Sequence, residues 1–286
     1  MADSATKNKG LRGRPDLATL LGLICGVGGI IAGFSLEGGV IQELLQPTAA
    51  LIVFGGTLGA VMVTTPFRVL KGAVGALVSV FMERNQSPGA IVEEIISYAT
   101  KARKNGIVSL EQDAEAVKDP FLRKALNLAV DGTDLQEIRK MMELEMITEE
   151  RRADGLAKVF ESAGGYAPTI GIIGAVLGLI QVMKHLENIN EVGKGIAVAF
   201  VATIYGVGSA NLFFIPAGNK IRIRAQAALQ LKELMLEGVS GIVEGLNPKL
   251  IRTKLQAYGD TEAQSKAKQA KAQTGKGETA AAAARS

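Results

Sequence analysis

The stretch SAGGYAPTIGIIGAVLGLIQVM, residues 162–183, decides the fold. It holds no Asp, Glu, Lys, Arg or His, and it exceeds the ~20 residues that a helix needs to cross a bilayer. The hydrocarbon core offers the backbone no hydrogen-bonding partners, so a crossing segment of this length has to be helical. The stretch therefore predicts a transmembrane helix.

Three further segments have the same property: Leu17–Leu36, Leu44–Phe67 and Gly195–Asn219. The first of them is not a cleavable signal peptide, because it lacks a small-residue cleavage site and a second span follows almost at once. We therefore predict an all-α, polytopic membrane protein with four transmembrane helices. A chain that is 48% hydrophobic fits such spans combined with a sizeable aqueous part.

The placement of Lys and Arg predicts the orientation of the spans. Basic residues flank the spans on one side: Lys7, Lys9, Arg12 and Arg14 before the first, Arg68 and Lys71 after the second, and Lys220, Arg222 and Arg224 after the fourth. The first short turn has Glu37 and Glu43 but no Lys or Arg. Because cytoplasmic loops carry the excess of Lys and Arg, we expect a multi-pass protein of the bacterial inner membrane with both termini in the cytoplasm.

The chain is expected to divide into six parts. These are a cytoplasmic tail (1–16), spans one and two (17–67), a helical cytoplasmic domain (68–161), spans three and four (162–219), cytoplasmic C-terminal helices (220–258) and a disordered tail (259–286). The 68–161 segment balances 14 Lys/Arg against 16 Asp/Glu, as a soluble block does. The last part has no large apolar residue that could build a core.

Residues that favour helix starts and ends occur in the soluble parts. We expect N-caps at Ser87, Asp119 and Thr133, each before a helical pattern, and a C-cap at Gly106. After the fourth span, a continuation helix is expected to reach about Gly245.

Glycine recurs every three or four residues in three spans: Gly22, Gly26, Gly29 and Gly33; Gly55 and Gly59; and Gly174 and Gly178. Such stripes let helix backbones approach closely in lipid. They serve packing either within one chain or between chains, and their presence in three spans favours an assembly of several chains.

The most informative feature of the spans is the absence of an acid. A protein that carries protons through the membrane needs a titratable group there, and this chain has none. Either the chain moves no ions or a partner helix supplies the acid. We also find no phosphate loop, no zinc-spaced Cys/His set and no nucleophile constellation. We therefore expect no enzyme, no cofactor, no metal and no nucleic-acid partner.

Four positions in the last two spans are candidates for an ion pathway. Pro168 and Pro216 each free a backbone carbonyl and permit a kink, which is either a harmless distortion or a hinge that couples ion movement to the cytoplasmic domain. Ala175 lies nine residues from Lys184, and Thr203 lies nine residues from Lys194, where these two lysines belong to the second short turn on the outer side. Both positions are therefore about 13 Å from the outer edge of the membrane. The hydroxyl of Thr203 either bonds its own helix or lines a hydrated path.

Several motifs resemble the MotA/PomA flagellar stator subunits. They include Phe54-Gly-Gly-Thr-Leu-Gly59 in the second span, Gly164-Gly-Tyr-Ala-Pro168 in the third, Ala202-Thr203-Ile-Tyr-Gly206 in the fourth, and Ala102-Arg103-Lys-Asn-Gly106 and Glu244-Gly-Leu-Asn-Pro248 outside the spans. The resemblance covers roughly residues 15–258.

The resemblance implies a homopentamer around two copies of a MotB-like subunit, which has one span with an essential Asp and a peptidoglycan-binding domain. That subunit would supply the missing acid. The resemblance also implies that Pro168 and Pro216 are functional prolines, and that Arg103 and Glu111 engage the rotor switch protein FliG. Without the motif, these two charges would be read as a solvated helix face.

The expected transported ion is H⁺ rather than Na⁺. Sodium-type relatives tend to have Thr where this chain has Ala175, and an apolar residue offers no oxygen ligand to Na⁺. Three alternatives to a flagellar stator remain: an energiser of the ExbB/TolQ kind, a motor for gliding or another task, and a scaffold without ion flux. The ExbB/TolQ relatives have three spans and begin outside, whereas four spans beginning inside favour the stator.

Overall fold

The computed structural model describes residues 14–83 and 87–256. These residues are helical apart from short connections and one antiparallel pair of two-residue strands, β1 (Arg14–Pro15) and β2 (Met82–Glu83). They form two compact units. We call residues 14–83 and 150–226 the span unit, and residues 87–149 and 227–256 the second unit.

Four helices are long and apolar enough to cross a membrane: Leu17–Leu36, Ile41–Thr64, Leu135–Lys184 and Ile189–Val243. The prediction of an all-α, multi-pass fold with four spans is thereby confirmed. The first span is α1 (Leu17–Leu36), and the third is the end of the 50-residue α9 (Leu135–Lys184). The fourth comprises α10 (Ile189–Ser209), the π-helix η3 (Ala210–Phe214) and the start of α11 (Ile215–Val243).

The second span consists of several short helical segments, and prolines mark the break after α2 and the end of the span. It comprises α2 (Ile41–Leu44), α3 (Pro47–Ala50), the π-helix η1 (Leu51–Gly55) and α4 (Gly56–Thr64). Gln46 and Thr65 both have extended backbones, because each precedes a proline that disfavours the helical conformation. The helix therefore ends at Thr64, three residues before the expected end at Phe67.

Tyr205 of α10 closes the first of these breaks. Its hydroxyl donates to the carbonyl oxygen of Leu44 at 2.5 Å and accepts the N–H of Gln46 at 3.4 Å. These backbone groups border the interruption between α2 and α3. The same two groups also bond each other at 3.2 Å, so the backbone polar groups at this bend are paired within the chain.

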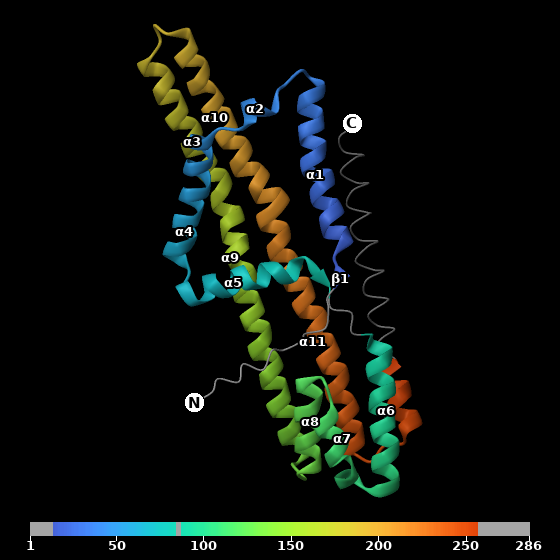
Figure 1. Cartoon of the computed structure of the whole chain (residues 1–286). Helices are drawn as coiled ribbons and strands as arrows, with labels where there is room; N and C mark the ends of the chain where they lie inside the picture. The colour runs from blue at the N-terminus through green and yellow to red at the C-terminus, as the bar shows by residue number, and fades with distance from the viewer. Residues whose placement is uncertain (1–13, 84–86, 257–286) are drawn as a thin grey trace, which may run out of the picture. The chain divides into compact units, whose positions relative to one another are not determined.

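The amphipathic helix α5 (Phe67–Val80) begins two residues after the second span ends. In Figure 1 it runs across the direction of α4 and α9. One of its faces packs with the ends of the spans, in a cluster that includes Ala73, Phe160 and Ile221. Residues 68–83 and 150–161, which we expected in the soluble domain of 68–161, thus belong to the span unit.

The second unit surrounds a core of large apolar side chains. Its elements are α6 (Pro88–Asn105), the 3-10 helix η2 (Ile107–Leu110), α7 (Glu111–Ala116), α8 (Pro120–Val130), the start of α9, the end of α11 and a helix over residues 248–256. Ile95, Leu110, Phe121, Leu126 and Met142 are at most 1% exposed in this core.

Helix ends in the second unit follow most of the expected signals. Asp119 accepts the N–H groups of Phe121 and Leu122, and Gly106 and Gly245 have positive φ after α6 and α11. Two expected caps were wrong in detail. The hydroxyl of Ser87 caps nothing, and the carboxylate of Asp134, not the hydroxyl of Thr133, accepts the N–H of Gln136 at the start of α9. The expected tails at 1–13 and 259–286 lie outside the described residues.

Candidate functional site

The third and fourth spans pack along a ladder of glycines. A Cβ on Gly206 would stand 2.5 Å from the carbonyl oxygen of Ala167, and one on Gly178 would stand 2.8 Å from the backbone of Ala199. Gly174 faces Ala202 in the same way. The stripe of the third span therefore serves packing within the chain, because backbones this close leave no room for a side chain.

The first span behaves differently. None of the side chains of α1 is buried, and Gly22, Gly29 and Gly33 face open space, whereas Gly26 lies against Leu212. A Cβ on Gly55 or Gly59 of the second span would likewise meet no heavy atom within 4 Å among the described residues. These surfaces are free to meet lipid or other chains.

The structure brings the backbones around the two candidate prolines together. A Cβ on Gly164, whose carbonyl cannot receive a bond from Pro168, would lie 2.6 Å from the side chain of Ile215, the residue before Pro216. Pro168 lies within the continuous helix α9, and Pro216 follows directly on the π-helix η3. The carbonyl of Gly164, which Pro168 deprives of its helical donor, thus lies at the same level of the bundle as the end of the π-helix before Pro216.

The π-helix η3 is a feature that our sequence analysis missed. Single-turn π-helices inside α-helices are rare and frequently mark functional sites. Within η3, the amide nitrogen of the Asn211 side chain donates to the carbonyl oxygen of Val207 at 2.9 Å. This polar side chain inside a span therefore bonds its own helix.

Ala175 and Thr203 lie at the same level, since their neighbours Gly174 and Ala202 are in contact. Both are half-buried. The hydroxyl of Thr203 donates to the carbonyl oxygen of Ala199 at 3.3 Å, which is a long bond to its own helix. That bond accounts for the hydroxyl without a hydrated path, and it leaves oxygen lone pairs free for water.

Thr57 of the second span is a polar residue that sequence analysis did not single out. It is 2% exposed, and its hydroxyl has no hydrogen-bond partner among the described residues. It continues the buried positions Ala49 and Val53 along the second span, with Val61 following. The four-residue spacing of Ala49, Val53, Thr57 and Val61 was the available signal.

At the edge of the span unit, Asp16 forms a buried cluster of charges. Its carboxylate lies 2.6 Å from the Lys220 ammonium and 2.7 Å from the Arg224 guanidinium, and it caps α1 by accepting the N–H of Thr19. The hydrogen bond from Lys220 holds the pKa of Asp16 far below its ordinary value, against the opposing effect of burial. Span one is thereby tied to the start of α11.

The candidate rotor-facing residues lie in the second unit. Arg103, at the end of α6, and Glu111, at the start of α7, are both exposed, and neither forms an ion pair within the described ranges. Two positions away from each, Lys101 and Asp113 form an ion pair of 2.6 Å that ties α6 to α7. Arg103 and Glu111 are thus presented by a fixed helix pair while their own charges stay available.

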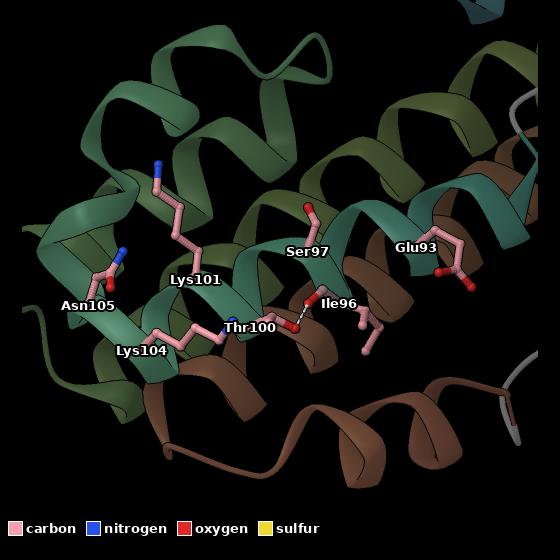
Figure 2. Close-up of a pocket in the computed structure, with 7 residues that line it drawn as sticks. All are labelled: Glu93, Ile96, Ser97, Thr100, Lys101, Lys104 and Asn105. Atoms are coloured by element: carbon pink, nitrogen blue, oxygen red, sulfur yellow. Dashed lines mark hydrogen bonds between the residues drawn. The ribbon is translucent and has the colours of Figure 1, made fainter.

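A shallow pocket lies along α6 beside these residues (Figure 2). Its described lining consists of Glu93, Ile96, Ser97, Thr100, Lys101, Lys104 and Asn105. Lys101 and Glu93 are already paired, with Asp113 and Arg252, and the Thr100 hydroxyl donates to the carbonyl of Ile96 at 2.8 Å. No converging set of free groups remains, and the described residues contain no cluster of potential metal ligands.

Fold and site together define a class of protein. The chain is a multi-pass membrane protein, and the uncharged stretches at the centre of its four spans contain no Asp or Glu. A model of the MotA/TolQ/ExbB proton channel family matches residues 113–234, and a model of the motility protein A N-terminal region matches residues 20–106. The chain belongs to the MotA/TolQ/ExbB proton channel family, which agrees with the expectation that it is not an enzyme.

Individual relatives support this assignment over most of the chain. Motility protein A of Bacillus subtilis is 36% identical, covering 91% of this chain and 97% of the relative. An uncharacterised protein of the same organism, YtxD, is 35% identical over 90% of this chain and 94% of its own length. The flagellar MotAB stator complex from Bacillus subtilis matches with a TM-score of 0.78 and 36% identity, over 84% of this chain and 95% of that chain.

Proposed function

We propose that this chain is the channel-forming A subunit of a flagellar stator, which converts a proton gradient into torque on the rotor. Five copies would surround two copies of a single-span, peptidoglycan-anchored B subunit. Similarity to a chain of the flagellar MotAB stator complex supports this partnership. The orientation we propose has both termini in the cytoplasm, where most of the Lys and Arg flanking the spans then lie.

One observation carries the proposal: the uncharged stretches 17–36, 44–67, 162–183 and 195–219 contain no Asp, Glu, His, Lys or Arg, although the chain belongs to a proton channel family. A proton cannot cross the hydrocarbon core without a group that binds it. The acid must then come from another polypeptide, and the Asp of a B subunit would supply it. The exposed, unpaired Arg103 and Glu111 add a surface suited to a charged partner such as the rotor protein FliG.

The decisive experiment measures proton flux in liposomes. Purified chain is reconstituted alone, with the B subunit encoded beside it, and with that subunit carrying Asn in place of its membrane Asp. Internal pH is then followed with a dye after an imposed membrane potential. We expect flux only with the unmodified B subunit. Full-rate flux from this chain alone would overturn the proposal.

Coupling of flux to motion is tested at the prolines. Changing Pro168 to Ala would restore a donor to the carbonyl of Gly164, at the level where Gly164 lies against Ile215. We expect swimming to stop while the protein stays in the membrane at its normal level. Normal swimming would remove Pro168 from the coupling mechanism.

The rotor surface is tested by charge reversal. Arg103→Glu should reduce torque, and a compensating reversal on the rotor protein should restore part of it. Lys118→Glu is the matched control, because Lys118 is an exposed, unpaired cation of the same unit outside the α6–α7 pair. Equal effects of the two changes would favour a general charge effect.

The identity of the transported ion is tested separately. Replacing external Na⁺ with K⁺ should leave rotation intact if the ion is a proton, and collapse of rotation would refute proton coupling.

A further inference from the structure

We infer that the exposed face of α5 is a membrane-surface anchor whose Arg68 and Lys71 bind anionic phospholipid headgroups. This inference uses the proposed orientation but does not depend on motor activity. It commits to lipid as the occupant of this face.

The first argument is the composition of the face. Phe67, Val74 and Val78 are 73%, 63% and 58% exposed, and Arg68 and Lys71 are exposed beside them. These five positions recur at the spacing of one helical stripe. The opposite face, with Ala73 at its centre, packs into the span unit. The helix α5 contains no acidic residue. A face of apolar and cationic side chains without acids is typical of helices that lie in the headgroup region.

The second argument is position. Only Thr65 and Pro66 separate α5 from the end of the second span, so α5 starts at the membrane edge. It then runs across the direction of the spans (Figure 1). Its exposed side chains therefore meet neither bulk water nor the centre of the hydrocarbon core.

The third argument concerns which cations are available. On α11, Lys220 and Arg224 are both bound by the single carboxylate of Asp16, and Arg222 is bound by Asp154 and Glu161 at 3.0 and 2.6 Å. Arg68 and Lys71, by contrast, have no ion-pair partner in the part of the chain that the structure describes. Headgroup phosphates would therefore compete with carboxylates on α11 but not on α5.

Other unpaired cations lack the apolar companions. Arg151, Arg152 and Lys158 of α9 are exposed, but α9 exposes no large apolar side chain between Thr148 and Glu161. Insertion into the headgroup region requires both apolar burial and charge attraction. Among the described residues of the span unit, α5 meets both requirements at the predicted inner edge.

Depth in the membrane is the first test. A nitroxide is attached at Val74→Cys in a Cys25→Ser background, and the full chain, with its B subunit, is reconstituted in bilayers. Collisions with oxygen should exceed collisions with a water-soluble nickel chelate. The reverse is expected for a label at Val108→Cys, an exposed residue of the second unit. A label at Val74 that behaves like the Val108 label, or that is shielded from both reagents by a second copy, would overturn the inference.

Lipid selectivity is the second test. Binding of phosphatidylglycerol over phosphatidylcholine is measured by native mass spectrometry of the complex. Arg68→Gln and Lys71→Gln should each weaken it roughly fivefold, and the effect should shrink at high salt. Lys118→Gln and Lys249→Gln each remove one charge from an exposed position of the second unit that has no ion-pair partner among the described residues, and neither should change the selectivity.

Two further arms make the result unambiguous. The variant Arg68→Lys with Lys71→Arg keeps both charges and should keep the selectivity, which separates charge from folding. Inorganic phosphate should not displace the lipid, because apolar burial is part of the site. Unchanged selectivity in the Gln variants, or equal loss in the control, would refute the anchor.

Discussion

The third and fourth spans meet through glycine and alanine, whereas helices of the second unit meet through large apolar side chains. Gly178 and Gly206 bring the backbones of α9 and α10 together, and Ala167 and Ala202 between them are fully buried. In the second unit, Ile95, Leu122 and Met142 fill the space between helices instead.

The difference follows from the two solvents. In water, removing apolar area from solvent drives folding, so bulky side chains stabilise a core. Lipid tails are as apolar as leucine, so helices in a bilayer gain little from that effect and associate by close contact. We therefore expect truncation of a large side chain to be the damaging change in the second unit, and enlargement of a glycine to be the damaging change between the third and fourth spans.

The largest effect is expected from truncation in the second unit. Leu126→Ala empties space at a fully buried position and should lower the free energy of unfolding by about 2–5 kcal/mol. Denaturant unfolding in detergent, followed by circular dichroism, measures it. The control Leu144→Ala, at a side chain that is 64% exposed, should have little effect. Similar losses in both variants would show that this core does not dominate stability.

Enlargement of a residue should be the damaging change in the span unit. Gly206→Ala places a methyl group 2.5 Å from the backbone oxygen of Ala167 and should cost about 1–3 kcal/mol. The control Gly208→Ala, on the same helix with nothing within 4 Å, should be neutral or stabilising. Thermal unfolding in detergent distinguishes them, and a neutral Gly206→Ala would contradict this expectation.

A smaller effect is expected where charge, rather than packing, holds the span unit. Asp16→Asn keeps a cap for α1 but removes the charge between Lys220 and Arg224, and it should cost about 1–2 kcal/mol. Asp154→Asn, which weakens only a partly exposed pair with Arg222, should cost less.

The stabilisation that the Asp16 carboxylate contributes should depend on pH in one direction. Because the pKa of Asp16 is lowered in the folded state, its contribution is fully present above the ordinary Asp pKa of ~3.9 and is lost as pH falls below it. The stability difference between the wild type and Asp16→Asn should therefore stay constant at neutral pH and shrink only in strong acid. A difference that changes near neutral pH would contradict the ion-pair cluster.

The smallest effect is expected at Thr57. Thr57→Val keeps the shape but removes a buried hydroxyl without a partner, so stability should rise by less than about 1 kcal/mol. Thermal unfolding and swimming are measured together. A clear loss of stability would show that the hydroxyl has a partner, and a loss of swimming alone would give it a role in ion movement.

The sequence allowed the spans and most helix ends to be predicted, because both depend on local properties. Uncharged stretches mark the spans, and Asp119 and Gly106 act on their own backbones. Ser87 is the N-cap residue of α6 as predicted, but its hydroxyl makes no capping hydrogen bond, because a Ser before a helix does not by itself fix its side-chain rotamer. The membership of α5 in the span unit was missed, since its apolar face finds partners more than eighty residues away, such as Phe160.

Candidate site residues could be selected from the sequence for the same reason, and their role in an ion pathway stays a prediction. Ala175, Thr203, Pro168 and Pro216 were selected from depth and residue type, but their mutual levels depend on how α9 packs against α10 and α11. The partnership of Asp16 with Lys220 and Arg224 joins residues some two hundred positions apart, which no periodicity reveals. The π-helices η1 and η3 were not predicted, because their backbone hydrogen bonds span five residues instead of four and no residue type indicates that change.

The π-helix η3 has a consequence for how this chain tolerates insertions and deletions. A π turn holds one residue more than an α turn, and each residue of an α-helix advances by about 100°. Removing one residue between Ala210 and Phe214 would convert the π turn into an α turn and leave the later side chains of α11 close to their present directions. Ala217 and Ile221 would then keep their places in the cluster that they share with Phe160. Removing one residue from the regular part of α10 would instead turn every later side chain by about that angle, so a single-codon deletion within η3 should be the better tolerated of the two.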